Sequence, residues 1–243
     1  ATRAAWVTLA NGAANNDSLL GRFVRSCGRN TSAIRPNTHA VAASHIVPGV
    51  RTVIEIGGQD SKLILLRDGV VTDFAMNTVC AAGTGSFLEE QAERLGISIK
   101  GEFSELALGC STPPPMGERC TVFIESDMVH YQQRGVEKDG LVAGLSYSIV
   151  QNYLNRVVGD RRIGNKIFFQ GGTAANLGVV AAFEKVLGQK PTGYLSPGHA
   201  STPNTLELVA EAGFVWWADP LNSDNPYTVE YPRWSRRRIE VIT

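Results

Sequence analysis

The chain has 243 residues, 43% of them hydrophobic and 19% charged, which is ordinary for a globular protein with a sizeable core. Its 23 basic side chains balance 23 acidic ones, so no long-range field directs it toward nucleic acid or anionic lipid. We see no apolar run of about 18 residues and no compact apolar leader, and we therefore expect a cytoplasmic protein without a transmembrane helix or secretory signal.

The first clear elements along the chain are strands. After a mostly small and polar segment, with one short helix expected at 39–43, three apolar runs within residues 52–77 predict a meander of three strands. Gly57-Gly58 separates the first two runs. Residues 67–69, Arg-Asp-Gly, are a typical hairpin turn between the second and the third.

Helices and one more strand follow the meander. Apolar residues at helical spacing predict helices over 83–95, 120–134, 141–158 and 176–187, and a short one over 203–212. Glycines end the first three of these helices. An apolar run predicts a buried strand over 166–170, and the chain beyond residue 214 has no clear period. Strands mixed with helices of crossover length indicate an α/β fold.

Glycine-rich turns follow two of the strands and open two of the helices. Gly57-Gly58 and Gly171-Gly172 each come directly after an apolar strand, and Gly83-Thr84-Gly85 opens a helix. Such turns let backbone N–H groups approach a phosphate without hindrance from a Cβ atom, and a helix N-terminus adds partial positive charge. A single glycine pair is more often only a tight turn. Three of them leave phosphate binding and a purely structural role evenly matched.

Polar residues around the first turn suggest a catalytic role. Glu55 and Asp60 offer the oxygen ligands that Mg²⁺ prefers, and Gln59 is placed to orient an attacking water. The alternative is a solvated turn that happens to be acidic.

Two of the four cysteines stand at predicted helix starts. Cys80 precedes the helix at 83–95, and Cys120 opens the next one. Helix N-termini stabilise a thiolate or an anionic metal–sulfur cluster, but two ligands do not complete such a site. A symmetric dimer would supply four. From composition alone, buried structural thiols are the more common interpretation. Cys110, in a proline-rich loop, is more often an ordinary loop residue than a third ligand or an exposed thiol, and Cys27 has no ligand-like neighbour.

Four segments in this order identify a family resemblance. They are IEIGGQDSKLILL, FAMNTVCAAGTGSFLEEQAERLGI, GERCTVFIESDMVHYQQRG and FFQGGTAANLGVVAAFEKVLG. They resemble the ATP-dependent activators of 2-hydroxyacyl-CoA dehydratases and the ATPase subunits of benzoyl-CoA reductases (the BadF/BadG/BcrA/BcrD type), over about residues 40–190. The resemblance implies an actin-like ATPase fold, shared with acetate and sugar kinases and heat-shock chaperones.

The resemblance also implies roles for particular residues. IEIGGQD is similar to the second phosphate-binding loop, with Glu55 where many relatives carry aspartate. FFQGGTAAN is similar to the adenosine-binding turn, which points to Gly171, Gly172, Thr173 and Asn176. Cys80 and Cys120 match the two positions that ligate one 4Fe–4S cluster bridging a homodimer.

The implied function is ATP-dependent electron transfer. ATP/ADP and Mg²⁺ would bind the chain, and the cluster would deliver one low-potential electron to a 2-hydroxyacyl-CoA dehydratase or benzoyl-CoA reductase-like component. Reduced ferredoxin or flavodoxin is the implied donor. Two alternatives stay open: a non-hydrolysing actin-like scaffold, and a small-molecule kinase, which would leave Cys80 and Cys120 unexplained.

The sequence departs from the family pattern at both ends. Residues 1–50 contain no Asp-x-Gly-Ser/Thr phosphate loop, so we expect an incomplete N-terminal lobe and doubtful hydrolysis. Beyond Leu187 the small-residue helix of the relatives is replaced by LELVAEAGFVWW. We therefore divide the chain into a first-lobe remnant (1–50), a nucleotide- and cluster-binding lobe (51–213) and a divergent tail (214–243).

Overall fold

A computed structural model describes most of the chain. It covers residues 6–9, 39–41, 43–44, 47, 49–77, 83–117 and 121–188, and, further on, 193–194, 206, 210, 216–217, 227–231 and 237–241. The architecture given below is that of these residues.

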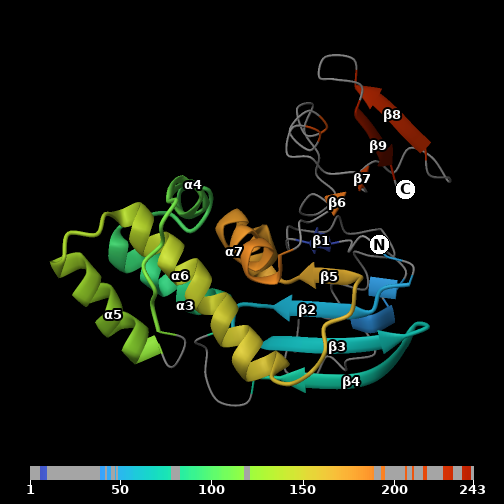
Figure 1. The fold of residues 1–243 in the computed structure, drawn as a ribbon, viewed down its shortest axis with the longest axis horizontal. Coiled ribbons are helices and arrows are strands. Elements are labelled where there is room, and N and C mark those ends of the chain that lie inside the picture. Colours follow the sequence, from blue (N-terminus) through green and yellow to red (C-terminus); the bar gives the residue numbers. More distant parts are fainter. Residues whose placement is uncertain are drawn as a thin grey trace, which may run out of the picture.

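A mixed five-stranded sheet organises the fold, in the order β1-β5-β2-β3-β4 (Figure 1). Its strands are β1 (Trp6–Leu9), β2 (Thr52–Ile56), β3 (Ser61–Arg67), β4 (Val70–Met76) and β5 (Ile167–Gln170). The strands β1, β5 and β2 run parallel, and β3 and β4 complete an antiparallel meander with β2. The predicted meander and the predicted strand at 166–170 are both confirmed.

The hairpin between β3 and β4 follows from its turn residues. Asp68 and Gly69 both have positive φ, 53° and 78°. Two consecutive residues with positive φ match the twist of antiparallel strands, and Asp-Gly adopts this geometry readily. The pairing of β2 with β3 places Glu55 directly opposite Lys62, which becomes important at the functional site.

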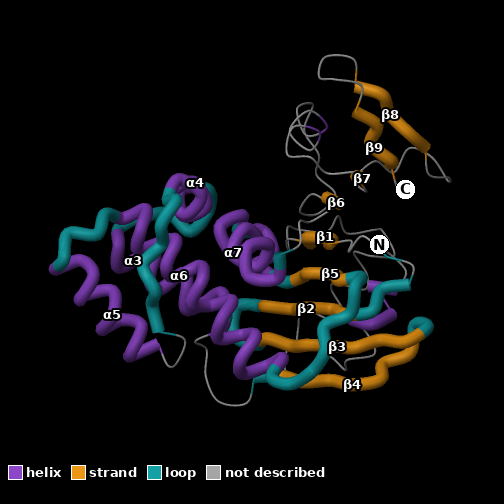
Figure 2. Tube along the Cα trace, in the orientation of Figure 1, coloured by secondary structure: helices purple, strands orange, loops and turns teal. Residues whose placement is uncertain are grey.

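Five helices pack beside the sheet, and Figure 2 shows them gathered largely on one side of the strands. They are α3 (Gly85–Leu95), α4 (Glu102–Gly109), α5 (Thr121–Gln133), α6 (Lys138–Tyr153) and α7 (Leu177–Leu187). The prediction at 83–95 is confirmed by α3, which ends at Gly96 in the left-handed conformation. The short α4 was not predicted, because its N-cap is Gly101 and no side chain caps its first turn.

The helix predicted over 141–158 differs from the observed one at both ends. It begins at Lys138, three residues earlier, and its last five residues, Leu154–Val158, form a π-helix before Gly159. Residues around α6 are buried on nearly every side, including Leu141, Leu145 and Ile149. A helix buried all round has no polar stripe to mark its ends in the sequence.

The two faces of the sheet differ in size and covering. On one face the helices bury a large apolar core that contains Ile54, Ile56 and Phe169. On the other face a small core forms around Val53 and Phe168, covered by the helical residues 39–41 and 43–44. The side chains alternate between the faces because successive residues of a strand point to opposite sides.

The described parts of residues 1–50 therefore pack on the same sheet as the rest of the chain. The strand β1 pairs with β5, and Ala40 and Ala43 are buried in the smaller core. The proposed division at residue 50 stays a prediction.

Four short strands beyond residue 190 form a second sheet, ordered β6-β7-β9-β8. They are β6 (Gly193–Tyr194), β7 (Trp216–Trp217), β8 (Tyr227–Tyr231) and β9 (Arg237–Val241). No hydrophobic period in this part of the sequence predicted them. Of the helix predicted at 203–212, only residues 206 and 210 are described, and both are helical.

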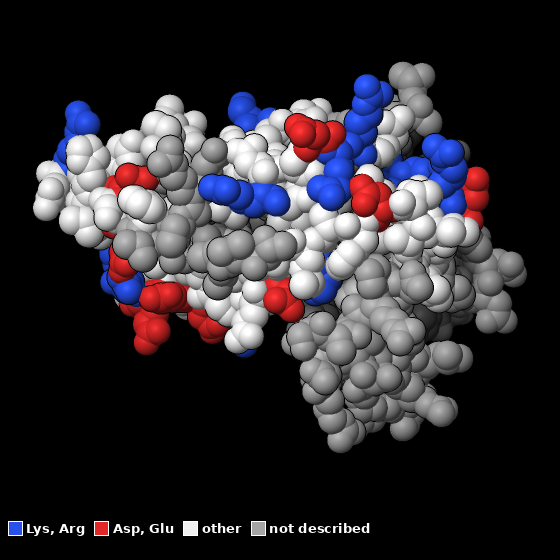
Figure 3. All heavy atoms as spheres, turned by 90° about the horizontal axis from the view of Figure 1, so that it is seen from below, with Lys and Arg blue, Asp and Glu red and all other residues white. Residues whose placement is uncertain are grey.

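Charge on the surface is mixed. On the face drawn in Figure 3, basic and acidic side chains are interspersed, with several acidic ones gathered toward its left end. No described helix has both the length and the apolar character that crossing a membrane requires.

Candidate functional site

The two glycine turns that follow strands lie at the same edge of the sheet. The strands β2 and β5 are parallel neighbours, with Glu55 in register with Gln170. Their carboxyl ends therefore meet, and Gly57-Gly58 and Gly171-Gly172 leave the sheet side by side. In open α/β sheets this edge is where ligands bind.

The second turn touches the first through its backbone. Gly171 has φ +100°, and a Cβ atom added there would lie 2.2 Å from the carbonyl oxygen of Ile56. The Thr173 hydroxyl donates a 2.9 Å hydrogen bond to the same oxygen. Only glycine permits this approach, so Gly171 locks the two turns together.

The third turn supports the first one directly. The backbone N–H groups of Gly85 and Ser86 donate 2.8 Å hydrogen bonds to the carbonyl oxygens of Gly57 and Gly58. A Cβ atom at Gly85 would lie 3.2 Å from the Gly57 oxygen. All three glycine turns predicted from the sequence therefore converge at this edge, and the start of α3 holds the Gly57-Gly58 turn in place.

Other predicted residues have visible structural partners. Asn176 caps α7, its side-chain oxygen accepting from the N–H groups of Gly178 and Val179. Thr84, fully buried, is the N-cap of α3. Gly172 differs from these, since a Cβ atom there would meet nothing within 4 Å. It is the position of the turn at which the backbone lies open to an incoming group.

Glu55 forms a buried ion pair with Lys62. The distance from Lys62 Nζ to Glu55 Oε2 is 2.8 Å, and both residues are less than a tenth exposed. Burial raises the pKa of the Glu55 carboxyl, the Lys62 ammonium opposes that rise, and the Asp60 carboxylate adds to it. Lys62 thus compensates for a charge that burial disfavours.

The remaining predicted catalytic residues lie in the turn itself. Gln59 is exposed and Asp60 half-buried. Asn77 ties this turn to β4: its side-chain oxygen accepts from the Ser61 N–H at 2.9 Å, and its amide nitrogen donates to the Gln59 carbonyl. Glu55 near the end of β2 and Gln59 and Asp60 in the turn that follows it therefore lie at the same edge of the sheet.

These residues fit Mg²⁺ only as part of a shared site. No cluster of three His, Cys, Asp or Glu side chains occurs among the described residues, and Glu55 Oε2 already accepts from Lys62. Mg²⁺ commonly takes one or two carboxylates together with phosphate oxygens and water. Glu55 and Asp60 are compatible with that pattern when a phosphate completes it.

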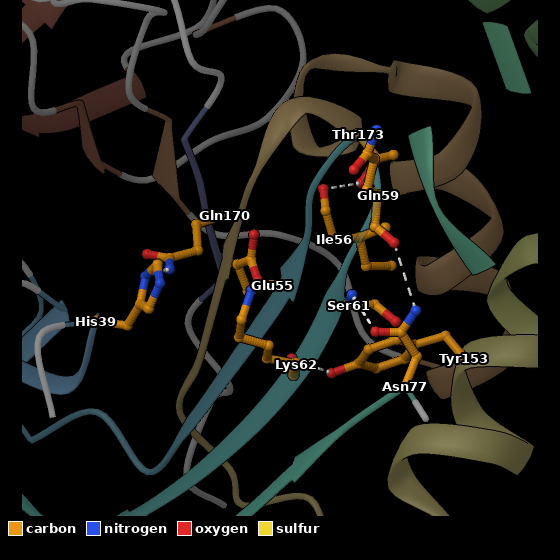
Figure 4. Close-up of polar contacts among 10 residues, drawn as sticks. All are labelled: His39, Glu55, Ile56, Gln59, Ser61, Lys62, Asn77, Tyr153, Gln170 and Thr173. Atoms are coloured by element: carbon orange, nitrogen blue, oxygen red, sulfur yellow. Dashed lines mark hydrogen bonds and ion pairs between the residues drawn. The ribbon is translucent and has the colours of Figure 1, made fainter. Parts of the chain in front are cut away.

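His39, which the sequence did not single out as a site residue, lies beside the buried Glu55–Lys62 ion pair. In Figure 4, His39 and Gln170 point toward one another beside the Glu55–Lys62 pair. His39 Nδ1 makes a short hydrogen bond with the Gln170 side-chain amide, and the buried His39 Nε2 has no partner within the described part of the chain. Burial, with a smaller effect of Lys62, lowers the pKa of His39 to about 4. The imidazole is therefore neutral at physiological pH.

The two predicted cluster ligands, Cys80 and Cys120, lie outside the described residues. Around Cys80 the described chain runs to Asn77 and resumes at Gly83, and around Cys120 it runs to Gly117 and resumes at Thr121. Cys110 is a half-buried free thiol. Burial raises the pKa of the nearby Tyr147, and the Coulombic effect of Cys110 adds a smaller rise.

Comparison with known families identifies the chain. The sequence pattern of the "BadF/BadG/BcrA/BcrD ATPase family" matches residues 20–200. The chain belongs to this family. All three converging glycine turns lie within the matched residues.

Several relatives have assigned names. The (R)-2-hydroxyglutaryl-CoA dehydratase activating ATPase of Acidaminococcus fermentans is 39% identical over 153 residues, which are 62% of this chain and 57% of that protein. A benzoyl-CoA reductase component of Thauera aromatica is 27% identical over 169 residues, 68% of this chain and 59% of that protein. The chain thus spans somewhat more than half the length of these two relatives.

Two solved structures of such activators resemble the chain. Component A of the Acidaminococcus fermentans (R)-2-hydroxyglutaryl-CoA dehydratase aligns with a TM-score of 0.60 at 32% identity, covering 73% of this chain and 65% of that one. The Clostridium difficile 2-hydroxyisocaproyl-CoA dehydratase activator, solved with bound ADPNP, aligns with a TM-score of 0.58 at 30% identity, covering 63% and 57%. The α/β, actin-like fold expected from the sequence is confirmed.

Proposed function

We propose that this chain is the nucleotide-binding and cluster-carrying part of an ATP-dependent electron-transfer activator. Its partner would be a 2-hydroxyacyl-CoA dehydratase or a benzoyl-CoA reductase-like component, and its electron donor reduced ferredoxin or flavodoxin. The observation that carries the proposal is the convergence of three glycine turns on the carboxyl ends of β2 and β5, in a chain of this ATPase family.

The phosphates of ATP would lie against the Gly57-Gly58 turn, and the Gly171-Gly172 turn would lie beside the adenosine. Small residues in the first of these turns allow the backbone N–H groups to approach a phosphate. Glu55 and Asp60 would share the Mg²⁺ with phosphate oxygens, and Gln59 would orient the attacking water. Asn176 and Thr173, which the fold already fixes in place, would border the adenosine.

A 4Fe–4S cluster, held by Cys80 and Cys120 of each protomer of a homodimer, would supply a one-electron carrier. Each chain would hold two of the four thiolates at the two-fold axis and would change their setting when ATP binds and is hydrolysed. The chain itself would not transform the acyl-CoA substrate.

Gly172 offers a test of nucleotide binding that spares the fold. A side chain at Gly172 meets no neighbour within 4 Å, and the same is true of Gly109 at the end of α4. We expect Gly172→Val to weaken ATP binding at least about tenfold, while Gly109→Val binds as the parent does. Calorimetric titration with ATP and Mg²⁺ measures this. Equal ATP affinity in both variants would contradict nucleotide binding at this edge of the sheet.

The cluster has a separate test. We expect about four iron atoms and four sulfides per dimer after anaerobic purification, and loss of both in Cys80→Ala and in Cys120→Ala. Absence of iron even after anaerobic reconstitution would contradict the electron-transfer role.

A second candidate is a scaffold that binds nucleotide without hydrolysing it. Phosphate release under saturating ATP distinguishes the two. Turnover supports the activator, and binding without turnover supports the scaffold.

A further inference from the structure

The turn that follows β5 ends at Asn176, whose side-chain oxygen is fully occupied. This oxygen accepts from the N–H groups of Gly178 and Val179 at 3.0 and 3.2 Å, and from the Ser104 hydroxyl at 3.2 Å. Asn176 and Ser104 are both less than a tenth exposed. An amide oxygen has two lone pairs, so three donors leave it no capacity for a further partner.

The nitrogen of the same amide lacks a partner. Asn176 Nδ2 is buried and has no hydrogen-bond partner among the described residues. The three donors around the oxygen prevent the amide from exchanging its two ends, so the nitrogen keeps its position as a donor. A buried donor without an acceptor is costly, and native proteins rarely leave one. An acceptor on a bound molecule would satisfy it.

Ser104 connects α4 to the beginning of α7. Its hydroxyl donates to Asn176, and its oxygen accepts the N–H of Leu177 at 3.2 Å. That N–H belongs to the first turn of α7, where backbone donors have no partner within the helix. Ser104 therefore fixes the orientation of the Asn176 amide and the first residue of the helix that follows it.

The two helices approach each other too closely for Ser104 to move away. A Cβ atom at Gly178 would lie 2.6 Å from the Cβ atom of Ala107, which is one helical turn beyond Ser104. Figure 1 shows α4 beside α7. The packing of α4 thus holds Ser104 against the turn that ends at Asn176.

Two leucines leave apolar surface on the same two helices. Leu177 directly follows Asn176, and Leu108 lies one helical turn beyond Ser104. Each is about half exposed. A nucleoside has an apolar base and a few hydrogen-bonding atoms, and sites for such ligands combine apolar surface with a small number of polar groups. The surroundings of Asn176 fit the nucleoside half of ATP better than its phosphates.

We propose that α4 takes part in nucleoside recognition, with Ser104 as a positioning residue for the Asn176 amide and Asn176 Nδ2 as the donor to a ribose or base acceptor. This inference rests on the proposed function, since it assumes that ATP binds at the glycine turns. It adds a helix that the sequence did not predict and assigns a particular atom to the nucleoside.

The test separates the two halves of the ligand by calorimetric titration of the full chain with ATP and with tripolyphosphate, both with Mg²⁺. Asn176→Ser keeps an oxygen that caps α7 but has no amide nitrogen. We expect about tenfold weaker ATP binding, as for the loss of one hydrogen bond, and unchanged tripolyphosphate binding. Ser104→Ala keeps the amide but releases it, and should weaken ATP binding by a smaller factor with tripolyphosphate again unchanged.

Ser146→Ala is the matched control. Ser146 is a buried serine beside the same end of α7, 3.2 Å from the position of a Cβ atom at Gly178, but its hydroxyl donates to the Val142 carbonyl of α6. Both affinities should stay as in the parent.

Titration with 2′,3′-dideoxy-ATP locates the acceptor. If the acceptor is a ribose hydroxyl, Asn176→Ser and the parent should bind this analogue equally. If the acceptor belongs to the base or the ring oxygen, Asn176→Ser should weaken binding of the analogue as much as binding of ATP. Both results support a donor to the nucleoside.

Three results would overturn the inference. They are parent-like ATP affinity in Asn176→Ser or in Ser104→Ala, equal losses of ATP and tripolyphosphate affinity, and a loss in Ser146→Ala as large as in Ser104→Ala. In each case the parent still binds ATP, so the proposed function stands. A parent chain that does not bind ATP would instead overturn the proposed function, and this inference with it.

Discussion

The two faces of the sheet are built from the same strands but hold different chemistry. On the face covered by the helices, Ile54, Ile56 and Phe169 pack with Phe183, whose ring meets Phe169 edge-on at 5.1 Å. On the opposite face, apolar packing gives way to charged and polar groups near the carboxyl ends of β2 and β5. Burial of a charge needs a compensating partner, and on this face Lys62 provides one for Glu55 where the glycine turns begin.

The difference shows where the fold buries a charged pair at a cost in stability. Between the apolar Ile54 and Ile56, the strand β2 places Glu55 on the other face, opposite Lys62. An apolar pair would be compatible with the same sheet. We interpret the ion pair as a feature kept for ligand binding rather than for folding, and three changes test that interpretation.

The largest effect is expected at Gly171, where the two glycine turns touch. Gly171→Ala places a Cβ atom 2.2 Å from a backbone oxygen at φ +100°. Strain and overpacking together should cost about 4 kcal/mol of unfolding free energy. Urea unfolding measures this. Gly172→Ala, in open space, is the matched control and should change stability by less than about 1 kcal/mol. Equal losses in the two variants would show that the close approach does not matter.

The next effect concerns the buried ion pair. Lys62→Met leaves Glu55 buried without its cation and should cost about 3 kcal/mol. Adding Glu55→Leu makes this face apolar like the other one and should recover most of that loss. The same double variant should lose Mg²⁺-dependent ATP binding. A double variant that is stable and still binds MgATP would show that Glu55 is not needed for MgATP binding.

The smallest effect concerns His39 and pH. The pKa of His39 is lowered from 6.5 to about 4 in the folded protein. Between pH 6.5 and pH 4, His39 is therefore protonated in the unfolded chain but neutral in the folded one. Stability is then complete above pH 6.5 and falls as pH drops toward 4. Because His39 is only partly buried, we expect a loss of about 2 kcal/mol.

His39→Gln provides the control for that pH dependence, since glutamine is neutral throughout the range. The difference in unfolding free energy between the parent and His39→Gln should change by about 2 kcal/mol between pH 6.5 and 4. A constant difference would mean that the imidazole titrates normally in the folded protein.

The sequence by itself determined the local elements and the family. The meander at 52–77, the Asp68-Gly69 turn and the end of α3 at Gly96 depend on alternation and on glycine conformations that short windows contain. The glycine turns were identified as phosphate-binding candidates, and their motifs carried the resemblance that the family match confirmed.

Only the tertiary structure decided which distant residues meet. Lys62 sits in an apolar strand that gives no sign of its charged partner, and His39 lies 131 positions from Gln170. The pairing of β1 with β5 and the contact of Ser148 with Gly117 likewise join separate parts of the chain. Propensity and periodicity act over a few residues, whereas these contacts exist because the whole sheet packs with elements on both of its faces.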